Sequence, residues 1–178
     1  MLEKVYSIDI DAPIGKVFAE ITKVNAQSRP MFDTHMRTDL KPGSRYFCES
    51  KSGARTFTTG KIVEVTPPGT KGERSARFVQ TFKFTNLPDD ETLVTWELSE
   101  PSPGKTRVKI VHSQFPGETK TFKAVDGGWP SILGRLKLVC ETGRISLKDR
   151  MMFAMMKSMM FMMPKSTLSS QVRAAEHN

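Results

Sequence analysis

The chain has 178 residues, of which 38% are hydrophobic and 26% are charged, and its mean hydropathy is −0.37. This composition indicates one folded domain with an appendage and excludes an intrinsically disordered chain. Lysine and arginine outnumber the acidic residues by 27 to 19, which gives a net charge of +8. Such a surplus favours anionic partners but does not bear on the fold.

The two cysteines, Cys48 and Cys140, lie far apart in the sequence, without a CxxC motif and without a neighbouring histidine. This pattern is neither a disulfide framework nor a zinc site, so we expect no metal. No nucleotide- or flavin-binding motif is present, and we expect no cofactor. The first residues lack the apolar core of a signal peptide, and no apolar run reaches the roughly 20 residues of a membrane span. These features predict a cytoplasmic protein.

The chain begins with a strand and a helix. Residues 2–11 alternate between apolar and polar side chains, which is typical of a half-buried strand. Pro13 then suits the first turn of a helix, and apolar residues recur over 14–21 with the spacing of an amphipathic helix. A further short helix is possible within residues 24–33.

Residues 35–115 consist of β-rich runs separated by clusters of proline, glycine and aspartate. This punctuation predicts a meander of antiparallel strands. The expected strands cover residues 35–40, 45–50, 55–65, 76–84, 92–100 and 106–115.

Residues 124–143 give the clearest helix pattern in the chain. We place Pro130 in its first turn and Gly143 at its C-terminal end. Its apolar stripe consists of Ile132, Leu133, Leu136, Val139 and Cys140.

Four segments resemble one known superfamily, the SRPBCC or START-like proteins. They are IDIDAPIGKVFAEIT, LKPGSRYFCES, TRVKIVHSQFP and DGGWPSILGRLK, and they occur in the expected order within residues 1–143. The branch that the chain resembles is the C-terminal domain of the activator of Hsp90 ATPase. The sequence differs from many relatives after the first helix, where it has RPMFD in place of a tryptophan.

The resemblance implies an α+β helix-grip fold. In this fold a curved antiparallel sheet of about seven strands wraps round a long C-terminal helix, and the cavity between them holds an apolar or amphipathic ligand. Members of the superfamily include lipid carriers, polyketide cyclases and chaperone activators, so the fold alone does not give the function.

Strand parity predicts which side chains face the long helix. His112 shares parity with Val108 and Ile110, and Gln80 shares it with aromatic neighbours on its own strand. A few polar groups among apolar walls are typical of ligand pockets, although a filled core would give the same pattern. We expect no catalytic residue, because no nucleophile or paired acid accompanies His112. The predicted pocket lining comprises Gln80, Phe82, Trp96, Val108, Ile110, His112, Trp129, Leu133 and Leu136.

The sequence changes character after residue 143. Residues 144–164 contain eight methionines between positions 151 and 163, in pairs that give an amphipathic helix an apolar face. Three partners could cover this face: the protein's own domain, a second chain or other protein, or a membrane surface. Residues 165–178 are expected to form a loose polar tail.

These patterns favour a domain that binds a hydrophobic or amphipathic small molecule, or a lipid, without catalysis. The first alternative is a chaperone-associated regulator similar to the Hsp90 ATPase activator, and a polyketide cyclase-like enzyme is a weaker one. Nucleic acid is not expected as a partner, because the basic residues are scattered without aromatic interleaving or a recognisable motif.

Overall fold

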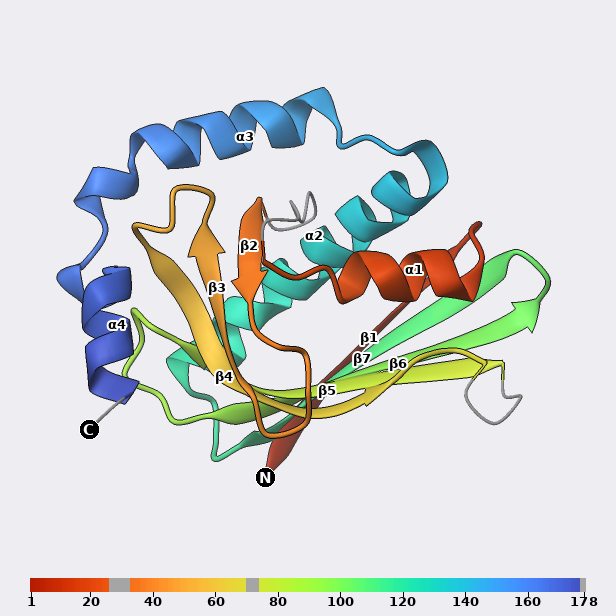
Figure 1. Cartoon of the computed structure of the whole chain (residues 1–178), viewed down its shortest axis with the longest axis horizontal. Helices are drawn as coiled ribbons and strands as arrows, with labels where there is room; N and C mark the ends of the chain where they lie inside the picture. Colours follow the sequence, from red (N-terminus) through yellow and green to blue (C-terminus); the bar gives the residue numbers. More distant parts are fainter. Residues whose placement is uncertain (26–32, 70–73, 177–178) are drawn as a thin grey trace.

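The computed structural model describes residues 1–25, 33–69 and 74–176. They form one antiparallel sheet of seven strands in the order β1-β7-β6-β5-β4-β3-β2, curved around a long helix (Figure 1). This arrangement confirms the predicted helix-grip fold. The strands are β1 (Leu2–Ile10), β2 (Thr34–Arg37), β3 (Arg45–Ser50), β4 (Thr56–Thr66), β5 (Ser75–Phe84), β6 (Thr92–Ser102) and β7 (Lys105–Phe115).

The first three α-helices follow the predicted order. The helices are α1 (Ile14–Ile21), the long helix α2 (Lys120–Thr142), α3 (Leu147–Ser158) and α4 (Ser169–Glu176), with short 3-10 helices η2 (Met160–Met162) and η3 (Lys165–Thr167). The further short helix proposed for residues 24–33 and the segment RPMFD fall mostly on residues 26–32, which lie outside the described residues.

The curvature of the sheet has local causes in β4. A Cβ on Gly60 would lie 2.3 Å from the carbonyl oxygen of Thr81 on β5, so only glycine fits this close approach of two strands. The pairing of β4 with β5 also shifts register between Ile62 and Glu64. An irregularity of this kind bends the strand and increases its twist, which helps the sheet to wrap round a helix.

The long helix begins ten residues earlier than Pro130, where the sequence placed its first turn. The helix starts at Lys120, and the side chain of its N-cap, Thr119, accepts a hydrogen bond from the backbone N–H of Phe122. Pro130 therefore lies inside the helix, where it cannot donate a backbone hydrogen bond. The predicted end is confirmed, because Gly143 adopts a left-handed conformation with φ of 74°.

The core lies between the concave face of the sheet and the helices α1 and α2. On β7, Val108, Ile110 and His112 are all 0% exposed, so the predicted inward parity is confirmed. Leu133 and Leu136 of α2 meet this face and are at most 2% exposed. Burying such side chains stabilises the fold by about 1.5–3 kcal/mol each.

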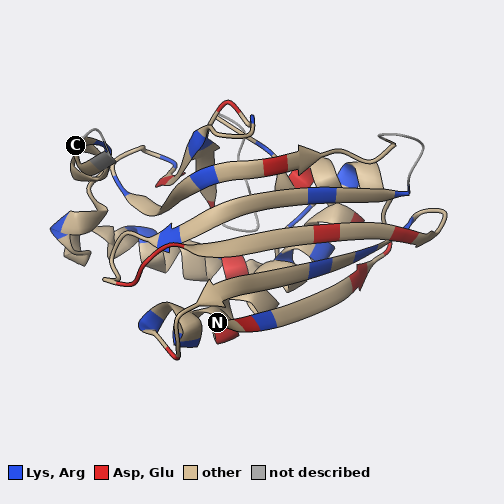
Figure 2. Ribbon diagram, turned by 90° about the horizontal axis from the view of Figure 1, so that it is seen from below, with Lys and Arg blue, Asp and Glu red and all other residues tan. Residues whose placement is uncertain are grey.

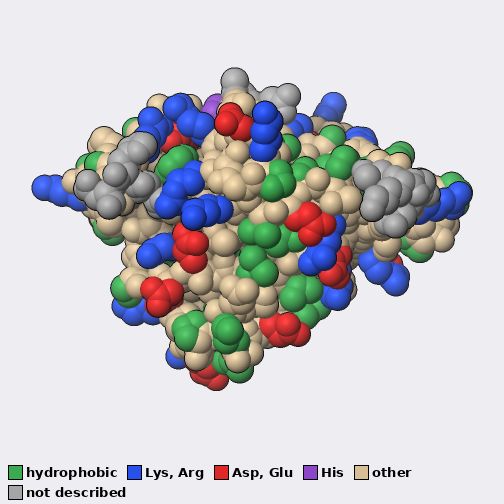
Figure 3. Space-filling model, turned by 60° about the horizontal axis from the view of Figure 1, so that its bottom comes forward, with side chains coloured by type: hydrophobic (Ala, Val, Ile, Leu, Met, Phe, Trp, Pro, Cys, Tyr) green, Lys and Arg blue, Asp and Glu red, His purple; other side chains and the backbone are tan. Residues whose placement is uncertain are grey.

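The opposite, outer face of the sheet carries charges of both signs (Figure 2). Glu64, Arg77, Glu97 and Lys109 form a row of alternating charge across four strands, with ion pairs of 3.7 Å at one end and 3.0 Å at the other. Figure 3 shows basic, acidic and hydrophobic side chains mixed over the side of the molecule that faces the viewer. Exposed pairs of this kind stabilise a fold only slightly.

The expectation of a loose tail after Pro164 is wrong for the described residues. Arg55, just before β4, donates hydrogen bonds to the carbonyl oxygen of Pro164 at 2.9 Å and to Oγ1 of Thr167 at 2.8 Å. Thr167 is 0% exposed, and Val172 of α4 is also buried. The sequence did not reveal this because the groups that bind the segment are distant in the chain.

Candidate ligand-binding site

All nine side chains predicted to line a pocket lie in one buried layer between the sheet and α2. None is more than 7% exposed. The layer contains Gln80 and Phe82 from β5, Trp96 from β6, Val108, Ile110 and His112 from β7, and Trp129, Leu133 and Leu136 from α2.

Aromatic rings form the centre of this layer. The Trp129 ring lies edge-on to that of Trp96, with centroids 5.5 Å apart, and 6.1 Å from that of Phe82. The Phe82 ring also meets the His112 imidazole edge-on at 5.1 Å. Such contacts favour one arrangement of the rings, so α2 is held in a fixed position over the sheet.

A chain of hydrogen bonds crosses the layer from helix to sheet. Trp129 Nε1 donates to His112 Nδ1 at 3.0 Å, and His112 Nε2 lies 2.7 Å from the hydroxyl of Thr92. That hydroxyl in turn donates to the carbonyl oxygen of Phe82 at 3.0 Å. Since Nδ1 accepts, a neutral His112 must carry its proton on Nε2 and donate it to Thr92. Both ring nitrogens are thereby occupied.

The surroundings of His112 hold it in the neutral form. Burial, with a smaller contribution from the positive charge of Lys4, lowers its pKa from 6.5 to about 3. A general base that works near neutral pH needs a pKa close to the working pH and a free nitrogen facing the substrate. His112 has neither, so its hydrogen bonds position the helix rather than serve proton transfer.

Charged and polar groups border the layer on the β1 side. Lys4 forms an ion pair with Asp126 of α2, and its ammonium group lies 3.8 Å from the centre of the Phe122 ring. The Tyr6 hydroxyl also donates to Asp126, at 3.1 Å, and burial is the largest cause that raises the Tyr6 pKa to about 12. These contacts join β1 to the first half of α2.

Two polar atoms in the buried layer have no hydrogen-bond partner among the described residues. They are Gln80 Oε1, an acceptor, and Trp96 Nε1, a donor. Gln80 pairs with Val94 in the sheet, and Trp96 is two residues further along β6, so the two side chains are diagonal neighbours on one face. An unsatisfied buried polar group costs about 1–3 kcal/mol, which makes this pair unusual.

Thr92 is the member of the hydrogen-bonded layer that the sequence prediction missed. It is 2% exposed and shares strand parity with Val94 and Trp96. That parity was the signal that could have identified it.

The structure also has surface hollows away from this layer. One of about 460 Å³ lies near the β2–β3 edge, and its lining includes His35, Arg37 and Glu49. A smaller one, of about 350 Å³, lies on the outer face of β1 and β7. Neither is lined by any of the nine predicted residues.

Within the described ranges, no cluster of three or more histidine, cysteine or acidic residues is arranged to hold a metal ion. Neither Cys48 nor Cys140 forms a disulfide within the described residues, and burial raises the pKa of the Cys140 thiol to about 11. A thiol with this pKa is a poor nucleophile and a poor metal ligand. In the same part of the chain, no helix has the length and apolar character needed to span a membrane.

The family and its solved structures agree with this architecture. Residues 11–141 match the family described as "Activator of Hsp90 ATPase homolog 1-like protein". An HSP90 activator from Plasmodium falciparum is 20% identical with a TM-score of 0.60, over 78% of this chain and 96% of that one. The Aha1 dimer from Colwellia psychrerythraea is 18% identical with a TM-score of 0.62, over 81% and 99%.

CalU16 from Micromonospora echinospora is 19% identical with a TM-score of 0.58, over 86% of this chain and 82% of that one. No curated protein matches by sequence. At these identities the solved structures establish the fold, whereas the family match covers well over half of the chain. The chain therefore belongs to the family of Activator of Hsp90 ATPase homolog 1-like proteins.

Proposed function

We propose that the protein binds a small amphipathic molecule between the concave face of its sheet and α2, without transforming it chemically. The observation that carries this proposal is the pair of partnerless atoms, Gln80 Oε1 and Trp96 Nε1, within an apolar layer. A hydroxyl group can donate to the first and accept from the second. The apolar body of the ligand would then contact the surrounding aromatic rings.

The same layer favours binding over catalysis. His112 is the titratable group at its centre, and both of its nitrogens are already hydrogen-bonded. Its lowered pKa removes it as a base or acid near neutral pH. Gln80 and Phe82 are the most exposed of the nine residues, at 7% each, so the ligand is expected to enter along β5.

The test compares probes that differ in a single hydroxyl. Dodecanol and dodecane are added to the purified protein, and binding is measured by native mass spectrometry and calorimetry. Dodecanol should bind at least about tenfold more tightly than dodecane, because its hydroxyl forms buried hydrogen bonds that dodecane cannot form. Gln80→Leu should reduce that preference, because only the bond from Trp96 Nε1 then remains, whereas Gln171→Leu on the exposed surface of α4 should leave it unchanged. Absence of any bound probe, or an equal affinity for both, would reject the proposal.

The family membership supports a second candidate function, stimulation of a chaperone ATPase. One structural neighbour is itself described as an HSP90 activator. The mixed charges on the outer face of the sheet offer a polar docking surface that the ligand layer does not use (Figure 2). Adding the protein to Hsp90 and measuring ATP hydrolysis tests this function. Charge reversal of Arg107 and Lys109 should reduce this stimulation but leave probe binding intact. If the parent protein does not change the rate of ATP hydrolysis by Hsp90, the second candidate function is excluded.

A further inference from the structure

Helix α3 presents its apolar side chains away from its own domain. Phe153 is the residue of α3 that is buried, at 9% exposure. Met151 and Met155 are two residues away on either side, which places them on the opposite side of the helix. They are 66% and 60% exposed, and Leu147 on the same side is 70% exposed. The helix is therefore amphipathic, but the side that carries these apolar residues faces solvent and not the domain.

The apolar surface continues beyond the end of the helix. Met159 is 50% exposed, Phe161 in η2 is 78% exposed and Met162 is 68% exposed. Contiguous exposed apolar surface on a folded chain usually marks an interaction site. We name the exposed large apolar residues between the start of α3 and the end of η2 the methionine surface; it comprises Leu147, Met151, Met155, Met156, Met159, Phe161 and Met162.

Contacts at both ends hold the methionine surface outward. At the N-terminal end, the hydroxyl of the N-cap Ser146 accepts a hydrogen bond from the backbone N–H of Asp149. The Asp149 carboxylate lies 3.4 Å from the guanidinium of Arg135, which also lies over the Phe153 ring. At the other end, Arg55 donates to the carbonyl oxygens of Met163 and Pro164. These anchors oppose a rotation that would turn the methionines toward the protein's own core.

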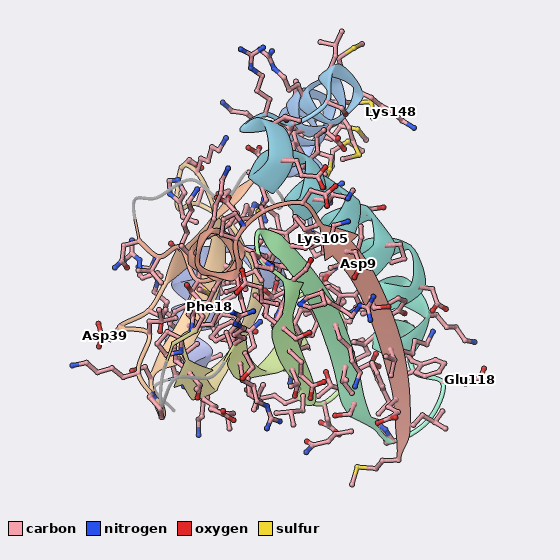
Figure 4. The ribbon with its side chains drawn as sticks, turned by 90° about the vertical axis from the view of Figure 1, so that its right-hand side faces the viewer. Asp9, Phe18, Asp39, Lys105, Glu118 and Lys148 are labelled. Atoms are coloured by element: carbon pink, nitrogen blue, oxygen red, sulfur yellow. The ribbon has the colours of Figure 1, made fainter. Side chains whose placement is uncertain are left out.

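The charges around this surface are almost all positive. Lys148, Arg150 and Lys157 project from α3 itself and are exposed. Asp149, the acidic residue of this segment, is already engaged by Arg135. The exposed basic side chains on and beside α3 make no ion pair with any residue in the described ranges 1–25, 33–69 and 74–176. They are Arg144, Lys148, Arg150, Lys157 and Lys165. Figure 4 shows Lys148 at the outer end of the molecule, beside the sulfur atoms of α3.

We propose that the methionine surface binds the interface of a membrane that contains anionic lipids. An interfacial helix needs an apolar face at the depth of the acyl chains and basic side chains at the level of the headgroups, and α3 supplies both. A second copy of the chain is a poorer match, because its basic residues would meet the same positive charges. The proposal uses none of the nine residues of the ligand layer, so it stands independently of the proposed function.

Vesicle flotation tests the proposal with the full chain. The protein is mixed with phosphatidylcholine vesicles, with or without phosphatidylserine, and the floating fraction is measured. We expect flotation only with phosphatidylserine, and less of it at high salt because the attraction is screened. The variant Met151→Gln/Met155→Gln should lower the partition coefficient at least about tenfold, since it removes two apolar side chains from the interface. Val63→Gln on β4, also at an exposed apolar position, is the matched control and should float like the parent.

Other outcomes would overturn the proposal. The parent chain could fail to float with phosphatidylserine vesicles, or the double variant could float as well as the parent. Sedimentation without lipid gives an independent result: a dimeric parent and a monomeric double variant would assign the surface to a second copy. Both substituted methionines are mostly exposed, so circular dichroism should show an unchanged fold in the variant.

Discussion

The indole nitrogen of Trp129 donates a hydrogen bond of 3.0 Å to Nδ1 of His112, joining the middle of α2 to β7. Both residues are almost fully buried. The bond fixes the tautomer of the imidazole and sets the position of the helix over the sheet.

Trp129→Phe should lower the free energy of unfolding by about 1–3 kcal/mol more than Trp96→Phe does. Both changes reduce an indole to a phenyl ring in the same layer, but only the first removes a hydrogen bond and leaves Nδ1 of His112 unsatisfied. Urea denaturation measures the difference. Equal losses for the two variants would show that the bond contributes no net stability.

Stability should fall as the pH decreases from about 7 to 5. His112 has its pKa lowered from 6.5 to about 3 in the folded protein. In this range the unfolded chain therefore takes up a proton that the folded protein does not, and acid favours unfolding by up to about 1.4 kcal/mol per pH unit.

The variant His112→Leu isolates this effect, because it lacks the titrating group. The carboxyl groups of Asp9, Asp126 and Glu141 have lowered pKa values and stay charged above pH 5, so they add little slope. Urea melts of parent and variant at several pH values give the two slopes. An identical dependence on pH in both proteins would contradict the burial of a neutral His112.

Leu136→Ala should destabilise the fold by about 2–5 kcal/mol, the usual cost of a cavity in a packed core. Leu136 is 0% exposed in the centre of α2. Leu147→Ala on α3, where the leucine is 70% exposed, is the control and should stay within about 0.5 kcal/mol of the parent. A cost for Leu136→Ala below the expected range would indicate that space already exists beside it.

Arg173→Gln should cost about 1–3 kcal/mol, because it withdraws a partner from a buried carboxylate. Glu49 is 3% exposed; Arg173 of α4 lies 2.5 Å from one of its oxygens and Arg37 lies 3.6 Å from the other. Lys165→Gln, at an exposed position without an ion pair in the described residues, should have little effect. Thermal melts compare the two variants.

A chain that ends at Gly143 lacks the whole docked C-terminal segment and tests its contribution to stability. It retains all seven strands and α2 and should still unfold cooperatively, but at a lower temperature than the parent because Arg173 and Thr167 are missing. A truncated chain as stable as the parent would show that the docked C-terminal segment does not support the β2–β3 edge.

Local patterns in the sequence predicted most of the elements. The strand expected at residues 45–50 and the helix expected at 14–21 coincide with β3 and α1. Alternation and turn residues act over a few positions, so they can be read without knowing the rest of the fold. The start of α2 was wrong because Pro130 resembles an N-terminal residue, whereas the cap at Thr119 and packing against the sheet hold the helix through it.

The composition of the buried layer also followed from the sequence. Parity placed Gln80 and His112 on the inner face of their strands, and both are buried there. Parity shows the direction of a side chain but not its partner. The bond from Trp129 to His112, the lowered pKa of His112 and the isolation of Gln80 Oε1 each depend on groups brought together from different elements.

The sequence by itself determined the order of the elements and the side of each strand that is apolar, because these properties are repeated locally along the chain. Only the tertiary structure decided that Met151, Met155 and Met156 of α3 face solvent while Phe153 faces the domain. Periodicity defines an apolar face without specifying what the face meets. Here the anchors at Arg135 and Arg55, distant in the sequence, set the rotation of the helix.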